Sequence, residues 1–182
     1  MSRTPPLPDF CDSILLDETT IRSRVAELGA EITRDFAGKD VRLVTVLRGG
    51  LYFLSDLSRA ITLDVSLDFL AVAPYVHGSG GTVRVTKDLD DSVRGAVIVV
   101  VEDVVDTGLT LNYVLSFLKA HEPEQVLVCA LLDKPARRIA PVKITYRGFE
   151  MQDDFLVGYG LDVAGRYRNL PYLASVRPEA LL

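Results

Sequence analysis

The 182-residue chain has few of the residues that usually build metal or redox centres: two cysteines, two histidines and no tryptophan. Cys11 and Cys129 are too few for a disulfide framework, and Cys129 lies in an apolar run where a small core residue is expected. His77 and His121 are too far apart in the sequence for a histidine-rich metal site or an evident Ser-His-Asp triad. The chain also lacks a Walker A pattern and a G-x-G-x-x-G pattern, which leaves nucleoside triphosphate and dinucleotide binding without support.

Charge and hydropathy exclude further classes. The net charge of −5 argues against a dominant nucleic-acid-binding face. We expect no membrane partner, because no apolar run is long enough to span a bilayer and residues 1–8 do not resemble a signal peptide. The sequence therefore predicts a cytoplasmic protein, with residues 1–182 forming one domain.

Strand-like and helix-like segments alternate along the chain. Apolar runs predict strands at 41–47, 65–73, 97–101 and 125–132, and helical spacing predicts helices at 17–37, 50–61 and 109–121. This alternation indicates an α/β fold with an open, mainly parallel twisted sheet flanked by helices. Short apolar runs near 142–146 and 155–157 predict a small hood subdomain instead of another βα repeat. We expect a core of about 37–140 and a hood from about 1–16 and 141–182.

The segment 97–111 carries most of the chemical information. A β-branched strand ends in Glu102 and Asp103, and Asp106-Thr107-Gly108-Leu109-Thr110 then leads into a helix. Backbone N–H groups and hydroxyls at a helix start suit a phosphate monoester, and paired carboxylates suit a sugar diol or a magnesium ion. A capped helix with exposed carboxylates is the simpler alternative. However, three carboxylates within five residues repel one another, which stability alone does not require.

This segment resembles the phosphoribosyl-pyrophosphate motif of the type I phosphoribosyltransferases, in their hypoxanthine-guanine branch. Three further segments resemble motifs of that family in the same order: 46–50 its pyrophosphate loop, 131–135 its purine-contacting lysine segment, and 154–162 its purine-stacking and metal-binding segment. Residues 168–172 follow the last of these. The likeness covers roughly residues 10–178, and implies the type I phosphoribosyltransferase fold.

The resemblance implies a role for each motif. Asp106 is the catalytic base, and the phosphoribosyl group binds at Glu102, Asp103, Asp106, Thr107, Gly108, Leu109 and Thr110. Pyrophosphate binds at Arg48, Gly49, Tyr75 and Arg168. The purine binds at Lys134, Phe155, Leu156 and Asp162, and Mg²⁺ binds at Glu102, Asp103 and Asp162. Without the resemblance, Lys134 would be a solvated lysine at a strand end, and Phe155 a core residue.

Three positions depart from the family pattern. Arg48 replaces a lysine and keeps its charge in a different geometry. Pro74 replaces a serine beside Tyr75 and so removes a hydroxyl and a backbone donor, and Leu156 replaces a valine. The family uses the loop that corresponds to 74–91 as a lid. Without the resemblance, we would interpret this loop as a simple surface connection.

The function implied is purine salvage. The enzyme would transfer the phosphoribosyl group of 5-phosphoribosyl 1-pyrophosphate to hypoxanthine or guanine, giving IMP or GMP and pyrophosphate. The alternative is a regulatory protein that senses phosphoribosyl pyrophosphate or nucleotides. The resemblance also implies a homodimer or homotetramer, and the sequence leaves open the preference among hypoxanthine, guanine and xanthine.

Overall fold

The computed structural model describes residues 4–74 and 83–181. A six-stranded sheet forms its centre, in the order β4-β3-β2-β5-β6-β7. Its strands are β2 (Val41–Val46), β3 (Val65–Pro74), β4 (Val83–Lys87), β5 (Val97–Val105), β6 (Gln125–Asp133) and β7 (Tyr146–Glu150). All neighbouring pairs are parallel except β3 and β4. The predicted open, mainly parallel sheet is therefore confirmed.

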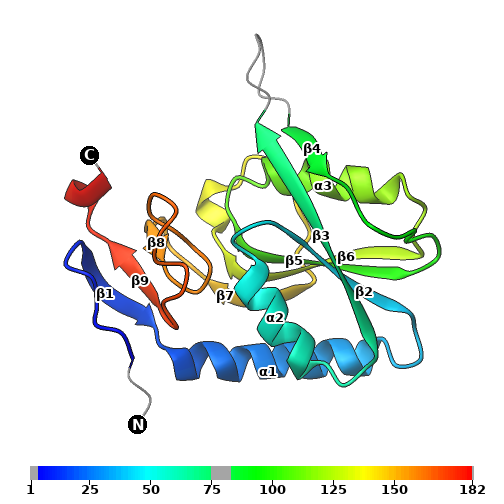
Figure 1. The fold of residues 1–182 in the computed structure, drawn as a ribbon, viewed down its shortest axis with the longest axis horizontal. Coiled ribbons are helices and arrows are strands. Elements are labelled where there is room, and N and C mark those ends of the chain that lie inside the picture. The colour runs from blue at the N-terminus through cyan, green and yellow to red at the C-terminus, as the bar shows by residue number, and fades with distance from the viewer. Residues whose placement is uncertain (1–3, 75–82, 182) are drawn as a thin grey trace.

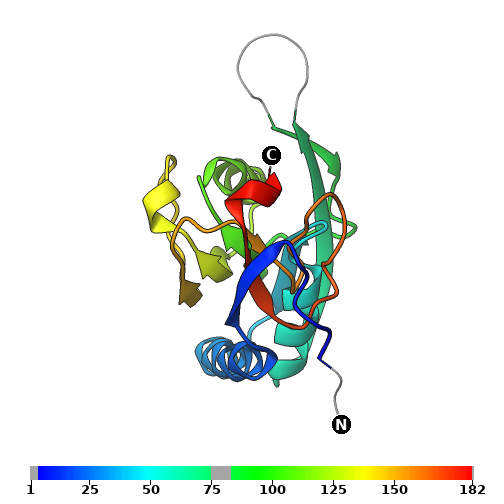
Figure 2. The same cartoon turned by 90° about the vertical axis from the view of Figure 1, so that its left-hand side faces the viewer.

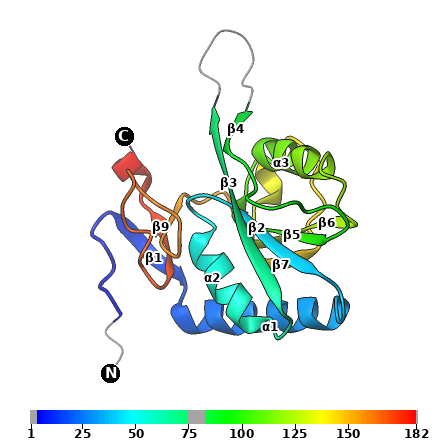
Figure 3. The same ribbon diagram turned by 45° about the vertical axis from the view of Figure 1, so that its right-hand side comes forward.

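Helices cover both faces of this sheet (Figures 1 and 3). Helices α1 (Glu18–Asp35) and α2 (Leu51–Ala60) lie on one face, and α3 (Leu109–Lys119) lies on the other. Strand β5 is buried on both sides: Val97, Val99 and Val101 pack in the cluster with α1 and α2, whereas Ile98 and Val100 pack in the cluster with α3. This two-sided burial explains its unbroken β-branched run, because neither face of a central parallel strand contacts water.

A separate three-stranded sheet joins the two ends of the chain. Strand β1 (Cys11–Leu16) pairs antiparallel with β9 (Leu173–Val176), which pairs with β8 (Leu156–Val157). Figure 2 shows β1 (blue) and β9 (red) in front of the larger sheet. Short 3-10 turns, η1 (Pro135–Arg137) and η2 (Pro178–Leu181), complete the elements.

Three features of the large sheet differ from the sequence-based expectation. The strand expected at 142–146 lies at 146–150, and it extends the large sheet beside β6 instead of joining the hood. The segment expected to be a plain loop, 74–91, contains β4. Strand β5 continues through Glu102 to Val105, four residues beyond its predicted end. The division into a core and a hood remains our proposal, with the hood formed by about 1–16 and by the residues after 150.

Candidate active site

Two cavities open at the carboxyl ends of the parallel strands, where open α/β sheets bind ligands. The first has a volume of about 260 Å³ and lies between the loop after β2 and the turn from β5 to α3. Its lining includes most of the residues predicted to bind the phosphoribosyl and pyrophosphate groups: Arg48, Gly49, Glu102, Asp103, Asp106, Thr107, Gly108 and Thr110. The fold thus brings together two motifs that are more than fifty residues apart.

The turn into α3 has the backbone geometry that a phosphate site needs. Gly108 precedes the helix with φ +79°, a conformation that disfavours any residue with a Cβ. The first backbone bond of the helix runs from the Asn112 N–H to the Gly108 carbonyl, so the N–H groups before it have no partner within the helix. The side chain of Leu109 is exposed and outside the cavity, so its contribution there is limited to its backbone N–H.

The loop opposite this turn approaches Asp103 closely. A Cβ built on Gly49 would lie 1.8 Å from the Asp103 Oδ2 atom, so only glycine allows this approach. The peptide bond between Leu47 and Arg48 is cis. Arg48 is exposed and lines the same cavity, which places a cation where pyrophosphate binding is predicted.

Glu102 and Asp103 are partly buried carboxylates at the end of β5. Burial raises the pKa of Glu102 well above its usual value, and the neighbouring Asp103 raises it further. Burial also raises the pKa of Asp103, whereas the hydrogen bond from the Val104 N–H acts in the opposite direction. Two buried carboxylates that repel each other form a site that a cation would stabilise.

The second cavity, also about 260 Å³, lies on the hood side of Asp106. It is lined by the four residues predicted to bind the purine, Lys134, Phe155, Leu156 and Asp162, together with Arg137, Asp153 and Asp154. Burial lowers the pKa of Lys134, against the attraction of Asp106, and its ammonium donates a hydrogen bond to the Asp154 carbonyl. Phe155 is 47% exposed, so it is available to stack and is not the core residue of the simpler interpretation.

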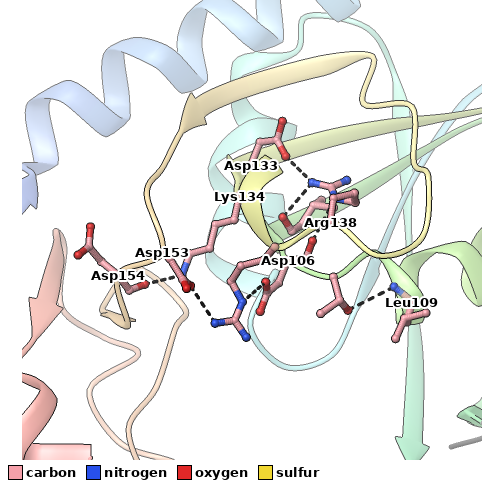
Figure 4. Close-up of polar contacts among 10 residues, drawn as sticks. Asp106, Leu109, Asp133, Lys134, Arg138, Asp153 and Asp154 are labelled. Carbon is pink, nitrogen blue, oxygen red and sulfur yellow. Dashed lines mark hydrogen bonds and ion pairs between the residues drawn. The ribbon is translucent and has the colours of Figure 1, made fainter.

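Asp106 lies at the junction of the two cavities. It lines both of them, and among the described residues only Val104 does the same. The Nε atom of Arg137 lies 2.6 Å from its Oδ1 atom, and the same guanidinium donates to Asp153 at 2.8 Å. Figure 4 labels the two carboxylates, Asp106 and Asp153. Arg137 therefore places a positive charge beside one oxygen of the predicted base, on the purine side, without the geometry of a hydrogen bond.

Asp162 and Arg168 form an ion pair with each other. The Arg168 Nη2 atom lies 2.6 Å from Asp162 Oδ1, and Asp162 Oδ2 accepts from the Gly165 N–H at 2.6 Å. Arg168 also donates to the Gly160 carbonyl and does not line the cavity that contains Arg48. Its predicted contact with pyrophosphate therefore stays a prediction.

Magnesium fits this site only if the substrate supplies some of its ligands. Within residues 4–74 and 83–181, no three acidic, histidine or cysteine side chains lie close enough to hold one ion. Mg²⁺ usually binds one or two protein carboxylates together with waters and substrate phosphates. Glu102 and Asp103, with Asp162 in the neighbouring cavity, suit that mode.

Some predicted residues lie elsewhere, and others were missed. Tyr75 lies outside the described residues. The sequence analysis did not identify Arg137 or Arg138, although both follow Lys134 in the turn after β6. The available signal was their position, because a charged pair just past the carboxyl end of a parallel strand lies at the ligand-binding edge of the sheet.

Among the described residues, no helix is long and apolar enough to cross a membrane.

Comparisons with known proteins identify the family. Residues 13–164 match the model of the phosphoribosyl transferase domain family. The chain is 46% identical over 180 residues to a hypoxanthine-guanine phosphoribosyltransferase of Mycobacterium avium, a match that covers 94% of this chain and 89% of that protein. It is 41% identical over 167 residues to the hypoxanthine phosphoribosyltransferase of Escherichia coli strain K12, covering 90% and 94% respectively.

Solved structures give the same result. A hypoxanthine phosphoribosyltransferase of Staphylococcus aureus superposes with a TM-score of 0.91 at 37% identity and covers 96% of each chain. The Trypanosoma cruzi enzyme, in complex with its product IMP, gives 0.90 at 34% identity and covers 96% of this chain and 99% of its own. The chain therefore belongs to the phosphoribosyltransferase family, in its hypoxanthine-guanine branch.

Proposed function

We propose that this enzyme transfers the 5-phosphoribosyl group from 5-phosphoribosyl 1-pyrophosphate to hypoxanthine, guanine or both, in purine salvage. The products are IMP or GMP and pyrophosphate. The observation that carries the proposal is the placement of Asp106 between the cavity at the start of α3 and the cavity lined by Lys134 and Phe155. A base in one cavity and a ribose in the other would meet beside this carboxylate.

The first cavity suits the phosphoribosyl group. The backbone N–H groups of the turn at Gly108 and the start of α3 would bind the 5′-phosphate, as helix starts bind anions. Glu102 and Asp103 accept hydrogen bonds and would hold the two ribose hydroxyls. The pyrophosphate group would then lie toward Arg48 and Gly49, where the Arg48 guanidinium supplies a positive charge.

The second cavity suits a 6-oxopurine. Phe155 offers an exposed ring for stacking, and the Lys134 ammonium would donate to the 6-oxo oxygen, which adenine lacks. Backbone carbonyls near Leu156 and Asp162 would accept from the purine ring. A base that lacks one of these hydrogen-bond partners would lose about 1–3 kcal/mol of binding free energy.

Asp106 would act as the general base. It would accept the proton at N7 of the purine while N9 attacks C1 of the ribose and the bond from C1 to the pyrophosphate oxygen breaks. The Arg137 guanidinium lies beside the Asp106 Oδ1 atom and also pairs with Asp153.

Glu102, Asp103 and Asp162 would hold Mg²⁺ together with the substrate. When bound, the ion neutralises negative charge on the leaving pyrophosphate. The raised pKa values of Glu102 and Asp103 support this assignment, because a buried pair of carboxylates gains most from a bound cation.

The regulatory alternative gains no support from the relatives, which are named as enzymes.

For the partners, we propose phosphoribosyl pyrophosphate, 6-oxopurines and their nucleoside monophosphates, with neither nucleic acid nor membrane. We also propose a cytoplasmic location and a homodimer or homotetramer. Leu47, Leu51 and Tyr52 are large, exposed apolar residues beside the active site and would suit a subunit contact. Light scattering on the purified protein measures the oligomeric state.

The direct test is an absorbance assay with phosphoribosyl pyrophosphate, Mg²⁺ and one base at a time: hypoxanthine, guanine, xanthine, adenine or uracil. We expect conversion of 6-oxopurines and none of adenine or uracil, and the ranking of rates will give the specificity. Conversion of adenine at a comparable rate would contradict the role of Lys134. Tight binding of phosphoribosyl pyrophosphate with no conversion of any base would favour the regulatory alternative.

A further inference from the structure

The turn that follows β6, residues 134–140, donates hydrogen bonds to the backbone of the phosphate loop. The phosphate loop is defined here as residues 105–108. The Lys134 N–H donates to the Val105 carbonyl at 3.0 Å, and the N–H groups of Ile139 and Ala140 both donate to the Thr107 carbonyl at 2.9 Å. The loop is therefore held by a segment that comes about thirty residues later in the sequence.

Arg138 supplies the remaining contacts. Its Nε donates to the Asp106 carbonyl at 3.0 Å and its Nη2 to the Val105 carbonyl at 3.1 Å. The same guanidinium pairs with the Asp133 carboxylate (Figure 4). With these bonds, each of the three carbonyls from Val105 to Thr107 accepts from residues 134–140.

Asp133 holds this guanidinium in place. Its side chain is only 3% exposed, so its charge needs close cations. Arg138 provides one, and Arg147 on β7 provides the other, with its Nε 2.9 Å from Oδ2. The Arg138 side chain is 17% exposed, whereas that of Arg147 is 50% exposed. The two arginines thus share one buried carboxylate, but only Arg138 contacts the phosphate loop.

Fixing the carbonyls also fixes the N–H groups. A trans peptide is planar, and its N–H points opposite to its C=O. The only cis peptide among the described residues is that between Leu47 and Arg48. Because the three carbonyls point toward the turn, the N–H groups of Asp106, Thr107 and Gly108 point away from it. These three residues line the first cavity on the other side.

We propose that Arg138 is a positioning residue for the 5′-phosphate, acting through the phosphate loop and kept in place by Asp133. This inference rests on the proposed function, which supplies the ligand. N–H groups that are oriented before the ligand arrives bind it without a further ordering cost. The turn also carries Lys134, so the phosphate loop and the predicted purine donor share one rigid support.

The test compares Arg138→Gln and Arg138→Lys with the matched control Arg147→Gln. All three variants leave Asp133 with at least one cation. The lysine of Arg138→Lys keeps the charge beside Asp133, but its single nitrogen cannot occupy the separate positions from which Nε and Nη2 of Arg138 donate. Steady-state kinetics would give KM separately for phosphoribosyl pyrophosphate and hypoxanthine. Calorimetry would give Kd for ribose 5-phosphate, and thermal unfolding would report stability.

We expect both Arg138 variants to raise KM for phosphoribosyl pyrophosphate and Kd for ribose 5-phosphate by about tenfold or more. KM for hypoxanthine should change less, and Arg147→Gln should leave all three constants within about twofold of wild type. A merely structural role would lower the unfolding temperature of the Arg138 and Arg147 variants without this selective loss.

Unchanged phosphate binding in Arg138→Lys, or an equal loss in Arg147→Gln, would overturn the inference. If Arg138→Gln does not fold, Arg138→Lys decides the outcome, because it retains the charge compensation of Asp133. If the wild-type protein converts no base, the proposed function fails. The ribose 5-phosphate affinities of wild type, Arg138→Lys and Arg147→Gln still test the positioning role in that case.

Discussion

Replacing Asp106 by asparagine separates catalysis from stability. The substitution keeps the shape of the side chain but removes its negative charge and its ability to accept a proton. Asp106 and its partner Arg137 are 41% and 45% exposed, and ion pairs this accessible contribute little to folding. We therefore expect the unfolding temperature to fall by a few degrees at most.

The effect on rate should be far larger. A positioned general base contributes about 10²- to 10⁴-fold, equivalent to roughly 3–5 kcal/mol in the activation barrier. The backbone N–H groups of Thr107 and Gly108 remain in place, so affinity for phosphoribosyl pyrophosphate should change only modestly. The variant should thus show a large loss of kcat with nearly normal KM for that substrate.

Asp153→Asn is the matched control. Asp153 is the other carboxylate that pairs with Arg137, at 2.8 Å, and it also lines the second cavity. Its loss perturbs the same guanidinium without removing the proposed base, so we expect kcat within a few-fold of wild type. Initial rates at saturating substrates, with unfolding curves for each variant, provide the measurements. A kcat of Asp106→Asn within about threefold of wild type would refute the assignment of the base.

Three further predictions concern other parts of the chain. Gly49→Ala should raise KM for phosphoribosyl pyrophosphate by about tenfold or more, because its Cβ displaces the Asp103 carboxylate. Unfolding curves should barely change, since the obstructing atom is at the tip of a side chain. Normal kinetics in this variant would contradict the contact. Tyr146 donates to Asp35 at 2.9 Å, and burial followed by that carboxylate raises its pKa well above 10. Because the unfolded tyrosine ionises first, stability should fall as the pH rises above about 10, and Tyr146→Phe should flatten that fall in denaturant titrations while losing about 1–2 kcal/mol at neutral pH. With Mg²⁺, phosphoribosyl pyrophosphate at about a hundred times its Kd should add about 2.7 kcal/mol of stability, and EDTA should remove most of it; equal shifts with and without EDTA would argue against a metal held by Glu102 and Asp103.

The large sheet could be predicted because each central strand has a local signal. The β-branched run of β5, for example, indicates a strand buried on both faces. Strand β4 was missed because its alternating Val-Arg-Val-Thr-Lys pattern is short and lies among charged residues and glycines. Strand β9 was missed because its partners, β1 and β8, include a segment from the far end of the chain. Such pairing leaves little local trace in the sequence.

The strand β7 was displaced for a similar reason. Val142 and Ile144 gave an apolar pattern, but in the structure they pack against the cluster that contains α3. The strand begins at Tyr146, opposite Cys129 of β6, and its register depends on that neighbour. In the site, motifs located the residues that face the cavities, whereas Arg137 and Arg138 act through contacts with a carboxylate and with carbonyls that only the folded chain reveals.

The shared wall of the two cavities has a consequence for the end of the reaction. Each substrate would occupy mainly one cavity, but a nucleoside monophosphate is a single molecule that spans both of them past Asp106. Its departure must break the contacts of the base and of the phosphate in one event, whereas pyrophosphate leaves from one side only. We therefore expect the nucleotide to leave more slowly than pyrophosphate, which stopped-flow measurement of the release of each product would reveal.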